Sequence, residues 1–427
     1  MIKTYEQAKA YLESFIPQPN TLHRTMQLDR IEWFCKLLGD PQKKYPIIHV
    51  GGTSGKGSTA TFAATILKEL GLKTALHISP HLKLLTERMQ IDNHAISIPR
   101  FLSLLNELTP IIQKMTDETR NGPPTYFEIL VVMSFLYFSR EKVDAAIIEV
   151  GLGGTLDGTN IIPPSVAVLT NVSLDHTQIL GNTVYKICKD KMGILKKGAP
   201  AVISGLTQPQ LRHMLIRKCQ ELDVPLYLAM RDFQIDSSNL SLPGEFQHLN
   251  FTLAKKAAAV FTHTYFPKLA SMLSTALKRA KKLAFIPGRL EIVNKNPLII
   301  LDGAHNRAKM KALVDALKKL YPKKKWIAVV AIKNDKAIRG MLRELNRITA
   351  QYIFTTFQTT TDFGKSLSTP PQTLARYTHI TSLKKTPVQE AIKSALSLSH
   401  FTKRPILITG SLYLVGEVRG LWSKKSY

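Results

Sequence analysis

Cysteine, acidic residues and long apolar runs are all scarce in this 427-residue chain. Its three cysteines, Cys35, Cys188 and Cys219, are too few for a disulfide framework, so we expect a reducing compartment. The longest apolar run, residues 129–138 interrupted by Ser134, is well short of the roughly 18–20 residues that cross a bilayer. The N-terminal segment has helical spacing and no secretory apolar core, which favours a cytoplasmic, non-membrane protein.

The shortage of acidic residues leaves the chain strongly basic. Only 31 Asp and Glu offset 58 Lys and Arg, a net charge of +27. Residues 295–427 hold 24 of the basic and seven of the acidic residues, a net +17. Such a field favours an anionic partner: a nucleotide, a polycarboxylate, a nucleic acid or an anionic membrane surface. Lysine runs are also common on solvated surfaces, so charge alone does not identify which of these partners, if any, the chain binds.

The remaining composition is that of a globular protein with room for two or three domains, since 44% of residues are hydrophobic and 21% charged. Short apolar runs alternate with helical patterns, which predicts a mostly parallel α/β sheet flanked by helices. The clearest runs are expected strands at 45–50, 144–150 and 166–172 and expected helices at 58–70 and 246–266. Ile286-Pro287-Gly288-Arg289 interrupts this pattern, and the alternation then restarts. We predict a phosphate-loop (P-loop) domain over residues 1–286, a linker over 287–294 and a smaller, Rossmann-like α/β domain over 295–427.

The strongest local motif is Gly52-Thr53-Ser54-Gly55-Lys56-Gly57-Ser58-Thr59, which follows an expected strand and opens an expected helix. Glycines let backbone N–H groups approach phosphates, and the helix N-terminus adds its dipole. Lys56 is placed to reach the outer phosphates, and the Ser58 hydroxyl to ligate Mg²⁺. The extra Gly57 between Lys56 and Ser58 departs from the commonest spacing. The alternative is a glycine-rich turn that binds no ligand.

Polar residues follow two further expected strands. Glu149 ends one strand, and Asp175 and His176 follow another. Because ligands of parallel sheets bind at the carboxyl ends of strands, Glu149, His176 and Ser58 are candidates for one Mg²⁺ site. Histidine is a less usual ligand for this ion, and a single histidine that caps a loop is the plainer interpretation.

The expected second domain has a similar pattern. Asp302 and His305 follow the apolar run 297–301, directly before an expected helix. They form either a second ligand-binding edge or a simple helix cap made by Asp302 or Asn306. Composition alone favours a surface position for Lys191, which lies in an amphipathic helical segment.

Taken in their order along the chain, the motifs resemble those of the folylpolyglutamate synthase/dihydrofolate synthase family, within the Mur-ligase-like proteins. The resemblance spans nearly the whole chain. Besides the glycine loop, it is carried by residues 79–82 (SPHL), 87–90 (ERMQ), 125–128 (TYFE), 149–160 (EVGLGGTLDGTN), 174–176 (LDH), 190–194 (DKMGI), 287–291 (PGRLE), 302–306 (DGAHN) and 409–411 (TGS). It implies a Mur-ligase-like central domain followed by a Mur-ligase C-terminal-like domain.

The resemblance also implies a reaction. ATP phosphorylates a carboxylate of dihydropteroate or folate, and the amine of L-glutamate then attacks the acyl phosphate, giving ADP and phosphate. The cofactors implied are ATP and Mg²⁺, the latter at two sites. The partners are small molecules, and the implied protein is a monomer that binds no membrane.

Roles follow for particular residues from the same resemblance. Lys56 and Ser58 hold the triphosphate and Mg²⁺, with Glu149 and His176 as further metal ligands. Lys191 matches a carbamylated lysine that supports the second Mg²⁺. The remaining roles are nucleotide contacts from Gln247, Asn250, Arg289 and Asp302, and a position near the phosphate or the acceptor for His305. The chain departs from the family's usual residues at Ser54, Thr155, Phe246 and Arg307.

Two other functions compete with this interpretation. One is a related Mur-type ligase that adds an amino acid to a peptidoglycan precursor, against which residues 79–82 and 87–90 favour folate. The other is a nucleic-acid-associated ATPase, suggested only by the charge of residues 295–427. Basic charge without base-reading elements is weak support for it.

Overall fold

The computed structural model describes residues 1–17, 27–118, 122–205, 208–334, 336–362 and 364–422, and the chain divides into two compact units. Unit 1 comprises residues 1–241, 247–284 and 362–364; unit 2 comprises 242–246, 285–361 and 365–427. The segment 287–294, expected to be a linker, lies in unit 2. In the described part of the chain, no helix combines the length and apolar character needed to cross a membrane.

Unit 1 is built on an eight-stranded sheet with the order β4-β3-β2-β5-β1-β6-β7-β8. All neighbours from β2 to β8 pair in parallel, and β3 pairs antiparallel with β2 and β4. The central strands are buried apolar runs, as a sheet covered on both faces requires. The strands are β1 (Ile47–Gly51), β2 (Thr74–His77), β3 (Met89–Ile91), β4 (His94–Ala95), β5 (Ala145–Glu149), β6 (Val166–Leu169), β7 (Ala201–Ile203) and β8 (Leu226–Leu228).

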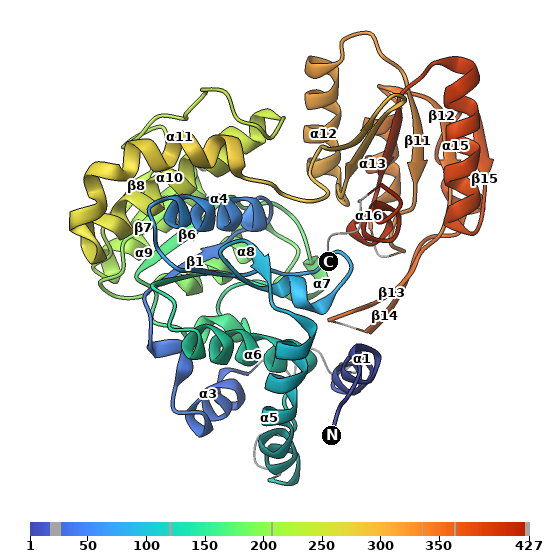
Figure 1. The fold of residues 1–427 in the computed structure, drawn as a ribbon. Coiled ribbons are helices and arrows are strands. Elements are labelled where there is room, and N and C mark those ends of the chain that lie inside the picture. The colour runs from blue at the N-terminus through green and yellow to red at the C-terminus, as the bar shows by residue number, and fades with distance from the viewer. Residues whose placement is uncertain (18–26, 119–121, 206–207, 335, 363, 423–427) are drawn as a thin grey trace. The chain divides into compact units, whose positions relative to one another are not determined.

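Helices cover both faces of this sheet, with α4, α10 and α11 on one face and α3, α5 and α6 on the other (Figure 1). Helix α6 is buried along most of its length and begins at a capping box made by Thr125 and Glu128. The helices of unit 1 are α1 (Tyr5–Glu13), α3 (Leu28–Leu37), α4 (Lys56–Glu69), α5 (Ile98–Asp117), α6 (Tyr126–Arg140), α7 (Thr177–Leu180), α8 (Val184–Lys191), α9 (Pro209–Glu221), α10 (Glu245–Tyr265, its first two residues in unit 2) and α11 (Leu273–Leu283). Short 3₁₀ turns lie at Pro41–Lys43, Leu85–Arg88, Gly158–Ile161, Met192–Ile194 and Pro267–Met272.

Unit 2 has a six-stranded sheet with the order β15-β12-β11-β16-β10-β9, parallel except for the edge strand β9. Helices α12 and α13 pack together over one side of its apolar core, in which Trp326 and Tyr352 are fully buried. The strands of this sheet are β9 (Glu291–Lys295), β10 (Leu298–Asp302), β11 (Trp326–Val330), β12 (Thr349–Phe354), β15 (Ser382–Lys384) and β16 (Ile406–Thr409). A separate two-stranded sheet is made of β13 (Gln358–Thr361) and β14 (Gly364–Leu367, its first residue in unit 1). The helices are α12 (Arg307–Leu320), α13 (Ile338–Leu345), α14 (Pro371–Ala375), α15 (Val388–Thr402) and α16 (Leu412–Arg419).

The predicted fold class is confirmed, because each unit is an α/β layer structure and the larger sheet is mostly parallel. Strand β1 lies between β5 and β6, so the segments that follow these three strands meet at one edge of the sheet. Those segments carry the glycine loop, Glu149 and His176. The fold therefore gathers these three candidates at one edge of the larger sheet.

Candidate active site

The glycine loop joins β1 to α4 and is pinned by the segment that follows β6. The Thr53 N–H donates to the Asn171 carbonyl oxygen at 2.9 Å, and the Ser54 N–H donates to Asn171 Oδ1 at 2.8 Å. Gly55 has a φ of +86°, and a Cβ there would lie 2.3 Å from Asn250 Oδ1, so the position requires glycine. The loop is thus fixed at the N-terminus of a 14-residue helix, where backbone N–H groups and the helix dipole favour phosphate.

A buried carboxylate lies against the first turn of α4. Glu149 ends β5, and its Oε2 accepts a hydrogen bond from the Ser79 N–H at 3.1 Å. A Cβ on Gly57 would lie 3.2 Å from the same oxygen, so Glu149 reaches the helix beside Ser58, which is buried as well. Carboxylate and hydroxyl oxygens are donors that Mg²⁺ prefers, so this predicted pair fits the ion.

His176 follows β6 at the same edge of the sheet. It precedes α7 with a left-handed backbone, at φ +48°, and the residue is exposed. Within the described ranges, no three His, Cys, Asp or Glu side chains are grouped so as to hold a metal ion. The structure therefore brings Glu149 to the glycine loop and places His176 at the same edge of the sheet.

Lys191, the last residue of α8, lies beside the glycine loop. Composition favours a surface lysine, and that expectation is wrong, because only 4% of the residue is exposed. Its Nζ donates to the Gly52 carbonyl oxygen at 3.0 Å. Burial lowers the pKa of Lys191 to about 7, and the positive charge of Lys56 acts in the same direction, against the opposing charge of Asp190. A lysine with this pKa is partly neutral near pH 7 and is then a nucleophile.

Two amide side chains at the start of α10 complete this side of the site. Gln247 and Asn250 are both buried, and Asn250 Nδ2 donates to Gln247 Oε1 at 2.9 Å. Asn250 also packs directly on Gly55 in the glycine loop. In the described part of the chain, Gln247 Nε2 is buried without a hydrogen-bond partner. An unused buried donor next to a phosphate loop fits a site that takes a polar ligand.

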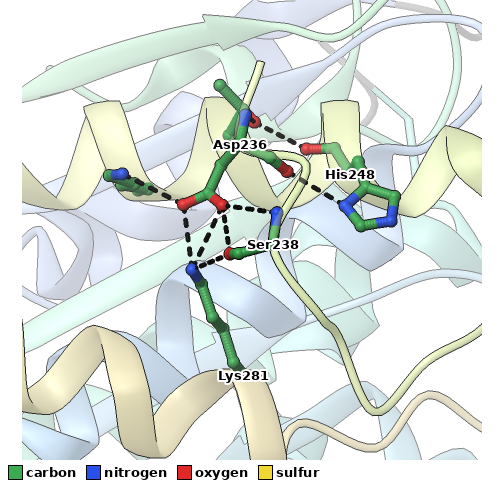
Figure 2. Close-up of polar contacts among 6 residues, drawn as sticks. Asp236, Ser238, His248 and Lys281 are labelled. Atoms are coloured by element: carbon green, nitrogen blue, oxygen red, sulfur yellow. Dashed lines mark hydrogen bonds and ion pairs between the residues drawn. The ribbon is translucent and has the colours of Figure 1, made fainter. Parts of the chain in front are cut away.

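A cluster of ion pairs ties α10 to the preceding segment and to α11 (Figure 2). The Asp236 carboxylate accepts hydrogen bonds from Lys281 on α11 and from Lys255 on α10, each at 3.0 Å, and from Ser238. His248 Nδ1 donates to the Asp236 carbonyl oxygen at 2.9 Å. Burial alone would raise the pKa of Asp236, but the hydrogen bonds from Ser238, Lys281 and Lys255 outweigh it and lower the pKa. The cluster holds the first turns of α10, which carry the two amides, in place.

In unit 2, the predicted residues gather at the end of β10. The Asp302 carboxylate accepts hydrogen bonds from the Ala304 N–H at 2.8 Å and from the Leu290 N–H at 2.9 Å. Burial raises the pKa of Asp302, and the positive charges of Arg289 and Lys309 work against that rise. Asp302 therefore shapes the turn that precedes α12, with Arg289 close by.

His305 lies in the same turn and uses both ring nitrogens. Its Nδ1 is 2.8 Å from the Gly303 carbonyl oxygen, and its Nε2 is 2.9 Å from Lys309 Nζ. Asn306, the N-cap of α12, accepts a hydrogen bond from the Lys309 N–H at 2.9 Å. Of the two caps expected from the sequence, Asn306 is thus the one that caps the helix.

Asp236 and Lys309 were missed by the sequence analysis. Asp236 is 45 residues away from Lys281, so no local spacing reveals their pairing. Lys309 follows His305 by four residues, a helical spacing that was a usable signal.

Three of the departures from family residues have local partners. The Thr155 hydroxyl donates to the Asp190 carbonyl oxygen at 2.8 Å, and Arg307 pairs with Glu344 at 3.5 Å. Phe246 packs on the apolar core of unit 2. Each substituted side chain is therefore used in packing or in a polar contact.

Known proteins resemble this chain over nearly its whole length. Residues 50–223 match the model of the Mur ligase middle domain, and residues 288–421 match that of the dihydrofolate synthetase C-terminal domain. The chain is 32% identical over 438 residues to folylpolyglutamate synthase from Lacticaseibacillus casei, covering 97% of this chain and 98% of that relative. It is 29% identical over 412 residues to dihydrofolate synthase/folylpolyglutamate synthase from Bacillus subtilis, covering 92% and 94%. A solved structure of folylpolyglutamate synthase from Mycobacterium tuberculosis, complexed with ADP and AMPPCP, matches with a TM-score of 0.87 at 26% identity over 99% of both chains.

Proposed function

The chain belongs to the folylpolyglutamate synthase/dihydrofolate synthase family of Mur ligases, and we propose that it joins L-glutamate to dihydropteroate, to the γ-carboxylate of a folate, or to both. It is an ATP-dependent, amide-forming ligase. The observation that carries the proposal is the glycine loop at the N-terminus of α4, with buried Glu149 and Lys191 placed against it. Of the relatives, the one from Lacticaseibacillus casei is named for the second activity alone and the one from Bacillus subtilis for both.

The proposed reaction has two steps. An oxygen of the acceptor carboxylate attacks the γ-phosphorus of ATP, and ADP leaves, so that an acyl phosphate forms. The neutral amine of glutamate then attacks the acyl carbon, phosphate leaves, and the nitrogen loses a proton to give the amide. Both steps bring anions together, so positive charge and oriented N–H groups supply most of the stabilisation.

Unit 1 supplies the groups for ATP. The loop from Gly52 to Thr59 surrounds the phosphates with its backbone, and Lys56 neutralises the transferred group. Ser58, Glu149 and His176 hold Mg²⁺, which when bound neutralises phosphate charge and orients the γ-phosphate. Gln247 and Asn250 contact the nucleotide from α10. This is supported by the packing of Asn250 on Gly55 and by the buried Gln247 Nε2, which has no hydrogen-bond partner among the residues that the structure describes.

Lys191 is proposed to act as a carbamate. Its neutral amine attacks CO₂ and releases one proton, which leaves a carboxylate where the lysine had a positive charge. The proposal is supported by burial, by the pKa of about 7 and by a position 3.0 Å from the Gly52 carbonyl oxygen. The new carboxylate supplies an oxygen ligand for a second Mg²⁺ beside the phosphate loop.

Three candidate residues lie in unit 2. We assign nucleotide binding to Arg289 and Asp302, and a place near the phosphoryl group or the acceptor to His305. The assignment is supported by their clustering at the carboxyl end of β10, the position where open α/β sheets bind ligands.

We further propose that the protein works as a monomer in the cytoplasm. All three cysteines are free and buried, which suits a reducing compartment. Size-exclusion chromatography with light scattering tests the monomer.

The proposed function is tested by ADP release in the presence of L-glutamate, with dihydropteroate or tetrahydrofolate as acceptor. We expect either acceptor, or both, to stimulate ADP release, and the product to gain one glutamate by mass spectrometry. If neither stimulates release while the protein binds Mg-ATP, the acceptor assignment is wrong. A peptidoglycan precursor in a parallel reaction identifies the related Mur-type activity.

A further inference from the structure

The contacts of His305 fix where its proton lies. A carbonyl oxygen only accepts hydrogen bonds, so the 2.8 Å contact with the Gly303 oxygen requires a proton on Nδ1. An ammonium group only donates, so the 2.9 Å contact with Lys309 requires a lone pair on Nε2. A doubly protonated ring would place an N–H against the ammonium. The two distances together therefore describe a neutral imidazole in a single tautomer.

The fold holds Lys309 at this place. Lys309 is in the first turn of α12, where its N–H donates to the capping Asn306 at 2.9 Å. Side chains in helices lean toward the N-terminus, which directs this lysine back over His305. The positive charge of Lys309 also acts on Asp302, which places it among the charged groups of the same turn.

The other charged groups near His305 come from three elements. Asp302 ends β10, and its carboxylate is engaged by backbone N–H groups. A Cβ built on Gly303 would lie 2.7 Å from Arg289 Nη1, so the Arg289 guanidinium is close to this turn. Arg307 on α12 forms an ion pair with Glu344 on α13 at 3.5 Å. Lys309 is a charged group in direct contact with the ring, at Nε2.

We propose that Lys309 is a positioning residue that keeps His305 neutral, with its proton on Nδ1, in the site of the ligase. The inference rests on the proposed function, in which His305 lies near the phosphoryl group or the acceptor. The Lys309 ammonium occupies the Nε2 lone pair, so His305 neither takes a proton there nor changes its ring orientation as the pH falls. Lys309 thereby adds a positive charge to this edge of unit 2 without using an ionised histidine.

The direct test is ¹⁵N NMR of the full-length protein labelled at histidine, with the His305 signals identified by their loss in His305→Gln. The wild type is expected to show an unprotonated Nε2 and a protonated Nδ1 from pH 8 down to pH 5.5. In Lys309→Met, Nε2 loses this donor, and His305 is expected to gain a second proton within this pH range. Lys309→Arg keeps a donor at this position and is expected to preserve the wild-type tautomer.

Lys311→Met is the matched control, because Lys311 lies on the same helix, is largely exposed and pairs with Asp315. It is expected to leave the His305 signals and the turnover unchanged. A His305 titration in the wild type that matches that of Lys309→Met would overturn the proposal. So would a loss of the tautomer in Lys309→Arg that is as large as in Lys309→Met.

Kinetics distinguish a positioning role from a purely structural one. Because His305 gains a proton as the pH falls in Lys309→Met, kcat of this variant is expected to fall more steeply than that of the wild type between pH 8 and pH 6. An equal loss at both pH values would overturn the positioning role. The NMR result does not depend on substrate, so a failure of the folate assignment is recognised separately by the absence of acceptor-stimulated ADP release.

Discussion

The buried amine of Lys191 gives the sharpest quantitative prediction. With a pKa of about 7, about half of the Lys191 side chains are neutral at pH 7, against roughly one in three thousand at the ordinary value of 10.5. The reactive form is thus enriched about a thousandfold over that of a surface lysine. With this pKa, the neutral fraction of Lys191 rises from about a tenth at pH 6 to about nine tenths at pH 8. Carbamylation at fixed dissolved CO₂ is expected to rise over the same range.

The assay is ¹³C NMR of the protein equilibrated with ¹³C-labelled CO₂ and bicarbonate at pH 6, 7 and 8. One carbamate signal is expected, growing with pH and absent from Lys191→Ala. Lys189→Ala is the matched control, since Lys189 lies on the same helix and is exposed. Lys191→Ala is also expected to lose ligase activity and to recover part of it with added small carboxylates. A full-size signal in Lys191→Ala, or none in the wild type at pH 8, refutes the reasoning.

Three further predictions test the site and its supports. Lys56→Ala is expected to abolish turnover with the circular dichroism spectrum unchanged, because we assign its side chain to the nucleotide phosphates. Gly57→Ala is expected to weaken Mg²⁺-dependent ATP binding by calorimetry, because the new methyl group would lie 3.2 Å from a Glu149 oxygen. Asp236→Asn is expected to lower the free energy of unfolding by about 2 kcal/mol in urea titrations, mostly through the ion pair with Lys281, whose side chain is only 19% exposed. Because folding lowers the pKa of Asp236, the difference in unfolding free energy between the wild type and Asp236→Asn is expected to be full at pH 7 and to shrink below about pH 4. A difference that does not change with pH would contradict the ion-pair explanation.

The sequence predicts well what local patterns and topology control. The apolar strand before the glycine loop and the helix after it are both present, as β1 and α4. The positions of Glu149 and His176 after parallel strands placed them at one edge of the sheet, because β1 lies between β5 and β6. The neighbouring order of those strands is a property of the whole sheet, which no single segment encodes.

Burial and long-range pairing are what the sequence could not give. Lys191 is an ordinary charged residue of a helical segment until the packing of α8 against the glycine loop buries it. The basic run 278–282 has the pattern of a solvated surface, yet Lys281 pairs with Asp236 and Ala280 is fully buried. The contact of Lys309 with His305 likewise depends on how α12 is capped.

The most direct test of the central claim uses an acceptor labelled with ¹⁸O at both oxygens of the reacting carboxylate. With ATP, Mg²⁺ and L-glutamate, an acyl phosphate requires that one ¹⁸O pass to the inorganic phosphate and one stay in the new amide. We therefore predict one ¹⁸O in each molecule of phosphate released with ADP, measured by mass spectrometry with dihydropteroate and with tetrahydrofolate. Phosphate that carries no ¹⁸O, formed while the amide product accumulates, would contradict the account.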